Sequence, residues 1–119
     1  MNADITKQPE DFLPLTFAVF HILIALVDKE RHGYGIILEI AQQTEGHLNM
    51  APGTLYGAIS RLLREGLIEE SDERPDPELD DKRRRYYKLT ELGHAVVTAE
   101  SHRLEMLVNI ARQKAILST

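Results

Sequence analysis

Cysteine is absent from the 119-residue sequence, and so is tryptophan. Without cysteine the chain has no disulfide and no thiolate metal ligand, which leaves a reducing compartment as the default. Residues 1–12 also lack the basic start, the apolar stretch and the small-residue cleavage site of a secretory signal. We therefore predict a cytoplasmic chain that begins with a flexible polar arm over residues 1–12.

A run of apolar residues long enough for a membrane span is also missing. The most apolar run, residues 13–27, has 15 residues, whereas a spanning helix needs roughly 20. Thr16 and His21 are the interruptions of its apolar character, so a helix here is predicted to be covered on several sides. In so small a domain, such a helix indicates that a partner chain supplies part of the cover.

The sequence has no overall excess of basic residues, because its formal net charge is -5. The charge is nevertheless unevenly distributed. Residues 69–81 contain eight acidic residues and one arginine, whereas residues 82–88 contain five basic residues and no acidic one. A phosphate backbone responds to charge within a Debye length, which is ~10 Å at 0.1 M salt. The overall acidity therefore does not exclude a nucleic acid as partner.

Hydrophobic periodicity, proline starts and glycine stops predict four helices and one hairpin. The helices are expected over residues 14–28, 34–44, 52–66 and 91–116, and the strands over residues 67–74 and 84–90. This order is typical of a winged helix-turn-helix, in which the third helix enters a DNA major groove and the hairpin forms the wing. The predicted fold is mainly α with a small β-hairpin: a DNA-binding domain over residues 13–90 and a C-terminal dimerisation helix over residues 91–119.

The helix predicted over residues 52–66 has small and cationic residues on the side away from the core. With Leu55 at the centre of the buried side and about 100° per residue, the outward face contains Thr54, Gly57, Ser60, Arg61 and Arg64. Small side chains allow close approach to base edges, an arginine matches guanine, and the helix start at Pro52 presents N–H groups to a phosphate. Tyr56 is expected at the boundary of this face, within reach of a phosphate. The alternative is that the glycine marks close helix packing and the arginines are merely solvated.

Four consecutive basic residues precede and begin the second predicted strand: Lys82, Arg83, Arg84 and Arg85. Directly after a helix-turn-helix, such a cluster favours contacts between the wing and the DNA backbone. Strand alternation puts Arg83 and Arg85 on one face and Arg84 on the other, so at most part of the cluster points at one groove. The alternative is a solvated edge strand whose charges prevent unwanted strand pairing.

The apolar residues of the C-terminal helix are too widely spread for a single packing surface. One set follows a seven-residue repeat, and a second set lies beside it. We predict that one face packs on the chain's own domain and the other on a second copy. The expected dimer interface contains Phe17, Phe20, Leu92, Val96, Ala99, Met106, Ile110 and Leu117. A single broad core face is the alternative.

Three segments resemble the PadR family of bacterial transcriptional regulators: HGYGIILEI, APGTLYGAISRLLREGLIEE and RRRYYKLTELG. The resemblance spans residues 13–93 and implies a homodimeric repressor of transcription that is often released by a small-molecule effector. It also implies that Tyr34, Thr54, Tyr56 and Arg83 to Arg85 contact double-stranded DNA. Two-fold symmetry of such a dimer requires an inverted-repeat operator.

Two features depart from the family pattern. The acidic wing loop over residues 69–81 is longer and more negative than is typical of the family, and the lack of tryptophan removes the main platform on which some relatives stack planar ligands. Phe17, Phe20 and His21 are the residues predicted to line a smaller effector cavity, with core packing as the alternative.

Catalytic, metal and cofactor sites are not predicted. None of the five histidines has the i, i+4 partners of a zinc-binding helix, and no glycine-rich phosphate loop follows a strand. Ser60 and Ser101 lack the local sequence of a nucleophile elbow. These observations argue against an enzyme. The remaining alternative to DNA binding is a winged-helix module that binds another protein, which the overall acidity favours slightly.

Overall fold

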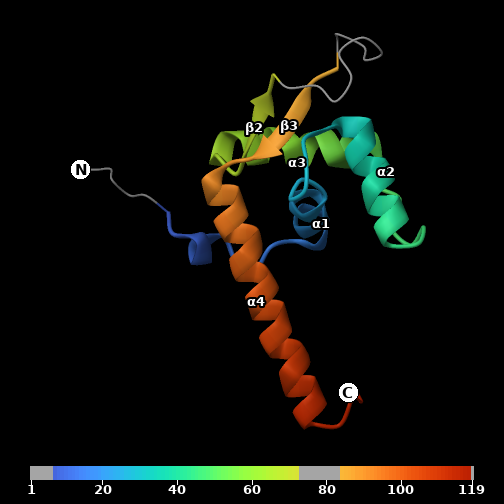
Figure 1. The fold of residues 1–119 in the computed structure, drawn as a ribbon, viewed down its shortest axis with the longest axis vertical. Helices are drawn as coiled ribbons and strands as arrows, with labels where there is room; N and C mark the ends of the chain where they lie inside the picture. The colour runs from blue at the N-terminus through green and yellow to red at the C-terminus, as the bar shows by residue number, and fades with distance from the viewer. Residues whose placement is uncertain (1–6, 73–83, 119) are drawn as a thin grey trace.

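The computed structural model describes residues 7–72 and 84–118. Within these ranges one turn of 3-10 helix precedes four α-helices and three short strands (Figure 1). The elements are η1 (Pro9–Phe12), α1 (Phe17–Ala25), β1 (Arg31–His32), α2 (Gly33–Gln43), α3 (Pro52–Glu65), β2 (Ile68–Ser71), β3 (Tyr86–Leu89) and α4 (Glu91–Gln113). The prediction of a mainly helical fold with a small β element is confirmed.

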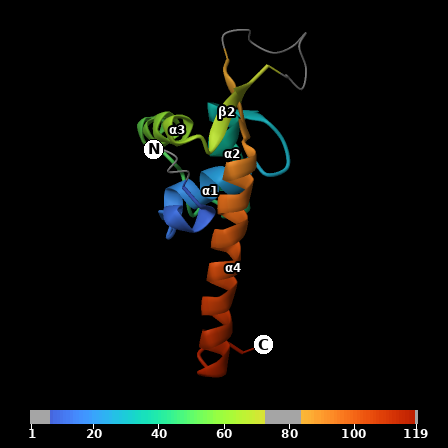
Figure 2. The same cartoon turned by 90° about the vertical axis from the view of Figure 1, so that its left-hand side faces the viewer.

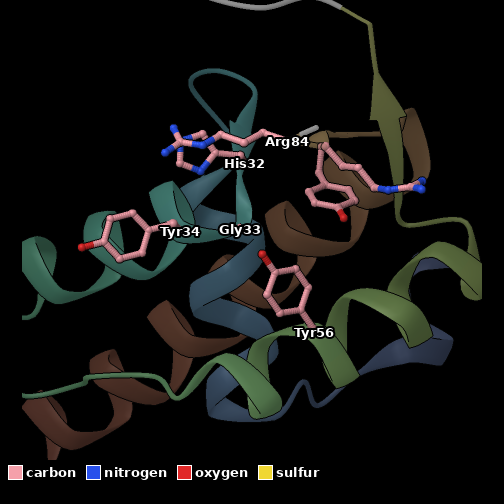
Figure 3. Close-up of a pocket in the computed structure, with 7 residues that line it drawn as sticks. His32, Gly33, Tyr34, Tyr56 and Arg84 are labelled. Atoms are coloured by element: carbon pink, nitrogen blue, oxygen red, sulfur yellow. The ribbon is translucent and has the colours of Figure 1, made fainter. Parts of the chain in front are cut away.

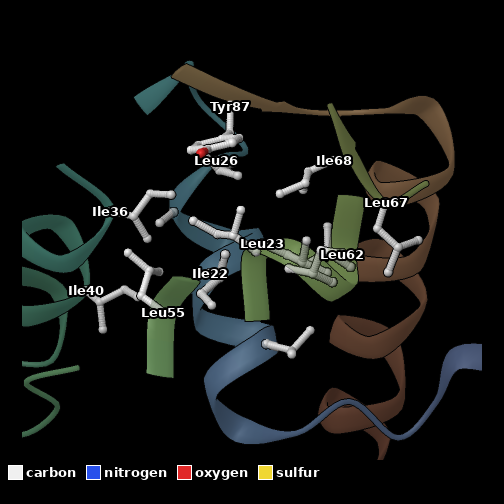
Figure 4. Packing of buried hydrophobic residues seen from close by; sticks show 14 of the residues in the cluster. Ile22, Leu23, Leu26, Ile36, Ile40, Leu55, Leu62, Leu67, Ile68 and Tyr87 are labelled. Carbon is white, nitrogen blue, oxygen red and sulfur yellow. The ribbon is translucent and has the colours of Figure 1, made fainter. Parts of the chain in front are cut away.

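The core forms around α1, which contacts α2, α3 and α4. Ile22 and Leu23 of α1 are completely buried, and Figure 4 shows them among apolar side chains of the neighbouring elements. The stripe predicted on α3 supplies Leu55 and Leu62, both fully buried, and α2 supplies Ile36. Burial of each such side chain contributes about 1.5–3 kcal/mol. The core therefore fixes α2 and α3 relative to each other.

Helix α1 is shorter than the predicted range 14–28 at both ends. It begins after Thr16, whose hydroxyl oxygen accepts a hydrogen bond from the Val19 N–H at 3.2 Å. At the other end, Arg31 Nε donates to the Ala25 carbonyl at 2.7 Å, and the Arg31 guanidinium pairs with Asp28 at 3.1 Å. Contacts from the following loop thus end the helix early.

The strands form a three-stranded antiparallel sheet in the order β1-β3-β2, whereas the sequence predicts a two-stranded hairpin. The additional strand, β1, has two residues, and they pair with Tyr86 and Tyr87 of β3. Two residues are too few for an alternating pattern, so the sequence alone does not indicate a strand here. Because β1 leads directly into α2, the start of β3 lies beside the helix-turn-helix.

Two glycines and a threonine join α3, the sheet and α4. Gly66 ends α3 in the left-handed region (φ 77°), as its position after the last apolar residue predicts. The Thr90 hydroxyl donates to the Gly66 carbonyl at 2.6 Å and accepts from the Gly93 N–H at 3.0 Å. At Gly93 a side chain has no room, because a Cβ would lie 2.9 Å from the Leu67 carbonyl carbon and closer still to its oxygen. The start of α4 is therefore held firmly against the loop after α3.

Burial along α4 changes from one end of the helix to the other, and not from one face to the opposite face. Val96 and Val97 are buried, and Leu92 packs partly against the core, whereas the distal half leaves the domain (Figure 2). One residue of the predicted dimer interface is wrong: Val96 is completely buried in its own chain, so it cannot contact a second copy. Leu117 is exposed but lies beyond the helix, which ends at Gln113.

Part of the predicted arm belongs to the folded domain. Residues 9–12 form η1, which contacts α4, and Phe12 packs on the core. Beside it, the buried Glu100 carboxylate of α4 accepts hydrogen bonds from the Leu15 N–H at 2.9 Å and from the Arg103 guanidinium. The Arg103 hydrogen bond lowers the pKa of Glu100, and the Leu15 hydrogen bond adds to this, against the opposing effect of burial. Glu100 therefore fastens the segment before α1 to α4.

Across the described ranges, none of the helices combines the length and the apolarity that crossing a bilayer requires.

Candidate nucleic-acid interface

The predicted outward face of α3 is exposed at all five of its positions: Thr54, Gly57, Ser60, Arg61 and Arg64. A Cβ added at Gly57 would meet nothing within 4 Å. Close packing within the described chain therefore does not explain this glycine. Arg61 is 49% exposed, with its Nε 4.0 Å from Glu65 Oε1. The face thus presents small residues along its centre with arginines beside them.

The start of α3 is also open to solvent. Pro52 is its first residue, Ala51 provides no side-chain cap, and residues 51–54 are all exposed. The first-turn N–H groups of a helix have no partner within the helix and favour an anion. This end of α3 is suited to a phosphate.

A cavity of about 300 Å³ lies between the start of α2, α3 and the residues that lead into β3. It is lined by His32, Gly33, Tyr34, Tyr56, Arg84, Arg85 and Tyr87. In Figure 3 the Tyr56 ring points from α3 toward Gly33, whereas the Tyr34 ring points away along α2. The structure thus brings together four residues with predicted DNA contacts from distant parts of the sequence: Tyr34, Tyr56, Arg84 and Arg85.

His32 connects the wing to α2 at this cavity. Its Nδ1 accepts a hydrogen bond from the Gly35 N–H at 3.0 Å, which caps α2, and its Nε2 lies 3.1 Å from Arg84 Nη1. Since Nδ1 is the acceptor, a neutral ring carries its proton on Nε2. His32 and Arg84 therefore both bring N–H donors to the cavity. His32 is not among the predicted site residues, because its only signal in the sequence is a position just before a predicted helix.

Arg85 and Tyr87 form the side of the cavity next to β2. The Arg85 guanidinium pairs with the Glu70 carboxylate (Nη1–Oε2 3.1 Å), and both side chains are largely exposed. Burial raises the pKa of the Tyr87 phenol, and the charge of Glu70 adds to the increase. Tyr87 thus stays protonated at neutral pH, and Glu70 offsets part of the positive charge of Arg85. Lys82, Arg83 and the acidic segment 73–81 lie outside the described residues.

The residues predicted for the dimer interface differ in exposure. Phe17 and Met106 are 73% and 57% exposed, Ile110 and Leu117 are also exposed, and Phe20 and Ala99 are partly buried. An open groove of about 920 Å³ runs between η1 and α4, and its wall includes Ala99 and Met106. Apolar surface of this kind is available for a partner along the distal half of α4.

The residues predicted for an effector cavity form an aromatic cluster on α1. The rings of Phe17 and Phe20 both lie edge-on to His21, at centroid distances of 4.7 Å and 6.2 Å. In this single chain Phe17 faces solvent, and the effector cavity itself stays a prediction.

The helix pair α2–α3 with its adjoining three-stranded wing defines a winged helix-turn-helix protein. The chain matches the family described as "Transcriptional regulator PadR-like family" over residues 22–99, and it belongs to that family. The resemblance seen in the sequence is thereby confirmed. Because this is a family of transcriptional regulators, the chain is not an enzyme. Among the described residues, no three histidine or carboxylate side chains converge as a metal site.

Individual relatives agree with this assignment. The chain is 36% identical over 87 residues to the transcriptional regulator Rv3488 of Mycobacterium tuberculosis, with 73% of this chain and 75% of that protein covered. It is 33% identical over 95 residues to an uncharacterized 37.1 kDa protein in transposon TN4556 of Streptomyces fradiae. That match covers 80% of this chain but a quarter (25%) of the relative. Among solved structures, Bacillus subtilis PadR in complex with operator DNA has a similar fold, with a TM-score of 0.58, 20% identity and coverage of 69% of this chain and 45% of that one.

Proposed function

We propose that the chain is a sequence-specific DNA-binding regulator in which α3 enters the major groove and the cavity beside it holds the phosphate backbone. The observation that carries this proposal is a juxtaposition. Tyr56 joins the exposed, unobstructed face of α3 to a cavity that also contains His32 and the wing residue Arg84. A winged helix-turn-helix needs an exposed helix face that contacts base edges and, beside it, hydrogen-bond donors that contact the phosphate backbone.

The side chains divide into two roles. Gly57 and Ser60 allow α3 to approach the base edges closely, and Arg61 and Thr54 supply sequence preference. Contacts to phosphate are assigned to Tyr34, Tyr56, Arg64, Arg84, Arg85, the N-terminus of α3 at Pro52, and the basic residues Lys82 and Arg83. The arginine and lysine contacts make affinity fall with salt, because each neutralised phosphate releases counterions from the DNA.

We further propose a homodimeric repressor that binds an inverted repeat with half-sites about one helical turn apart. The exposed apolar side chains on the distal half of α4 support a second copy as partner. The fold likeness to a PadR bound to operator DNA supports the choice of DNA. Since a repressor acts where the chromosome is, we place the chain in the cytoplasm. A small-molecule effector would act at Phe17, Phe20 and His21, against a wall formed by the second copy.

The test is a gel-shift experiment with the DNA upstream of the protein's own gene, repeated at two salt concentrations. We expect saturable binding that weakens steeply with salt. Arg61→Ala is expected to cost about 1–3 kcal/mol and to relax preference at one position of the site. Arg112→Ala, which removes the same charge from the exposed distal part of α4, is the control. A protein-binding module would show no saturable binding at low salt.

A further inference from the structure

Gly33, the first residue of α2, is buried beneath the Tyr56 ring (Figure 3). A Cβ at position 33 would lie 2.6 Å from Tyr56 Cζ and closer still to Oη, which is inside van der Waals contact. The backbone at Gly33 has no positive φ, unlike that of Gly46 and Gly66. Space for Tyr56, not backbone conformation, is therefore what requires glycine at this position.

We propose that Gly33 is a positioning residue for a phosphate-binding site. Because it has no side chain, the Tyr56 ring lies against the start of α2, and its hydroxyl joins His32 and Arg84 around one phosphate of the DNA backbone. This inference rests on the proposed function and adds the residue that sets the geometry of the backbone contact.

The chemistry of the cavity fits a phosphate group. It contains the Tyr56 phenol, the His32 Nε2–H and the Arg84 guanidinium, all of them donors, at the N-terminal end of an 11-residue helix. The positive end of the helix dipole adds to the attraction for an anion. Charge-assisted hydrogen bonds to phosphate are the strong class of hydrogen bond.

Tyr56 has room to move if Gly33 is enlarged. The side chain is 48% exposed, and the atoms that a Cβ at position 33 would contact lie at the far end of the ring. Gly33→Ala is therefore expected to turn the ring toward solvent, which removes the hydroxyl from the site at little cost in stability. At Gly93, by contrast, the obstruction is the Leu67 backbone, which cannot move aside in this way.

The experiment measures operator affinity by fluorescence anisotropy for the full chain and its variants. Gly33→Ala is expected to bind about tenfold more weakly, as for the loss of one hydrogen bond to a charged group. The salt slope should stay the same, because the displaced phenol carries no charge and neutralises no phosphate. Gly35→Ala is the matched control, since its Cβ would lie at an ordinary 3.5 Å from His32 Cε1. It is expected to bind like the wild type.

A double-mutant cycle tests whether Gly33 acts through Tyr56. In the Tyr56→Ala background, Gly33→Ala is expected to cause no further loss. A loss of full size in that background, or wild-type affinity of Gly33→Ala alone, would overturn the proposal. If Gly33→Ala does not fold, Tyr56→Phe supplies the test, because it keeps the ring and removes only the hydroxyl: a similar loss supports the site, and unchanged affinity overturns it.

These outcomes are distinct from a failure of the proposed function. If the wild-type chain shows no saturable DNA binding at low salt, the proposed function itself is refuted. If the wild-type chain binds DNA and the Gly33→Ala variant binds equally well, only the proposed role of Gly33 is refuted.

Discussion

Three glycines of this chain are required or allowed for different reasons. Gly93 lies against the backbone of Leu67, so its small size serves the fold. Gly33 lies against a movable tyrosine ring, so its small size serves the position of that ring. A Cβ at Gly57 would meet no atom of the described residues within 4 Å, so packing among those residues does not require its small size. The surroundings of the three glycines thus distinguish a position where small size is needed for folding from positions where we propose that it is needed for DNA binding.

Gly57→Ala is expected to weaken DNA binding and to stabilise the protein. Alanine in a helix interior is favoured over glycine by about 0.5–1 kcal/mol, and none of the residues that the structure describes opposes the added methyl group. In the complex the same methyl group would separate α3 from the base edges. Denaturant unfolding and anisotropy, measured on the same samples, give the two quantities. Unchanged affinity in the stabilised variant would show that α3 does not approach DNA at Gly57.

Glu70→Gln is expected to tighten DNA binding. The Glu70 carboxylate pairs with Arg85 in the free protein, so its neutralisation releases the guanidinium for a phosphate and removes a like charge from the interface. An exposed ion pair contributes at most about 1 kcal/mol, which limits the gain to roughly fivefold. Glu69→Gln is the matched control, because Glu69 is an exposed neighbour that pairs in register with Lys88. Equal effects of the two variants would point to general charge rather than release of Arg85.

At the scale of elements, the sequence predicts those whose limits are set locally. Pro52, the stripe from Leu55 to Leu62 and Gly66 are all local signals, and α3 has nearly the predicted bounds. The C-terminal end of α1 depends on Arg31, which lies beyond the helix and donates to the Ala25 carbonyl, and β1 forms because Tyr86 and Tyr87 supply its partners. Periodicity alone cannot reveal contacts that come from another part of the chain.

The same distinction applies to the candidate site. The outward face of α3 follows from helical geometry, so its exposure is predicted residue by residue. The cavity cannot be predicted from helical geometry, because His32, Tyr56 and Arg84 come from three separate parts of the chain that only the fold brings together. The division of α4 was mispredicted for a related reason: both of its apolar stripes are buried near the domain, and both are exposed beyond it.

The link between α4 and the segment before α1 makes a prediction about acid stability. Glu100→Gln is expected to lower the free energy of unfolding by about 1–3 kcal/mol at neutral pH, as for a buried hydrogen bond to a charged group. The folded-state pKa of Glu100 lies below the ordinary value of 4.5. Its contribution is therefore present above pH 4.5 and is lost as the pH falls through the folded-state value.

Urea unfolding of the two proteins across this pH range checks the prediction. The difference in stability should narrow as the solution becomes more acidic. Glu105→Gln, an exposed change on the same helix, should leave stability nearly unaltered at every pH. A difference between wild type and Glu100→Gln that stays constant down to pH 3 would contradict an ionised Glu100 as the anchor.

At the scale of the whole molecule, the distal half of α4 has apolar side chains without cover in the described chain. Met106, Leu107 and Ile110 are each about half exposed, at 57%, 47% and 45%. Contiguous apolar surface on a small protein marks a contact with a partner. Among the described residues, Phe17 of α1 is also exposed, at 73%, so the proposed contact with a second copy includes α1 as well as the distal half of α4.

Met106→Lys is expected to convert the proposed dimer into a monomer, because a charge in the centre of an apolar interface loses its hydration. Sedimentation velocity measures the change directly. Ser101→Lys introduces the same charge at an exposed position about 140° around α4 from Met106 and should leave the proposed dimer intact. Dimers of Met106→Lys at micromolar concentration would place the interface elsewhere.

One continuous helix carries the reading domain at one end and the proposed contact with the second copy at the other. The length of α4 therefore sets both the distance between its two ends and the rotation of one end relative to the other about the helix axis. A single residue inserted after Ser101 would advance the far end by about 1.5 Å but turn it by about 100°, so the two reading heads would arrive at the duplex with the wrong azimuth. Seven inserted residues would nearly restore that azimuth, about 10 Å further along. In the proposed dimer, a change of helix length by a whole pair of turns would therefore keep the relative orientation of the two DNA-binding domains, whereas a change of one residue would not.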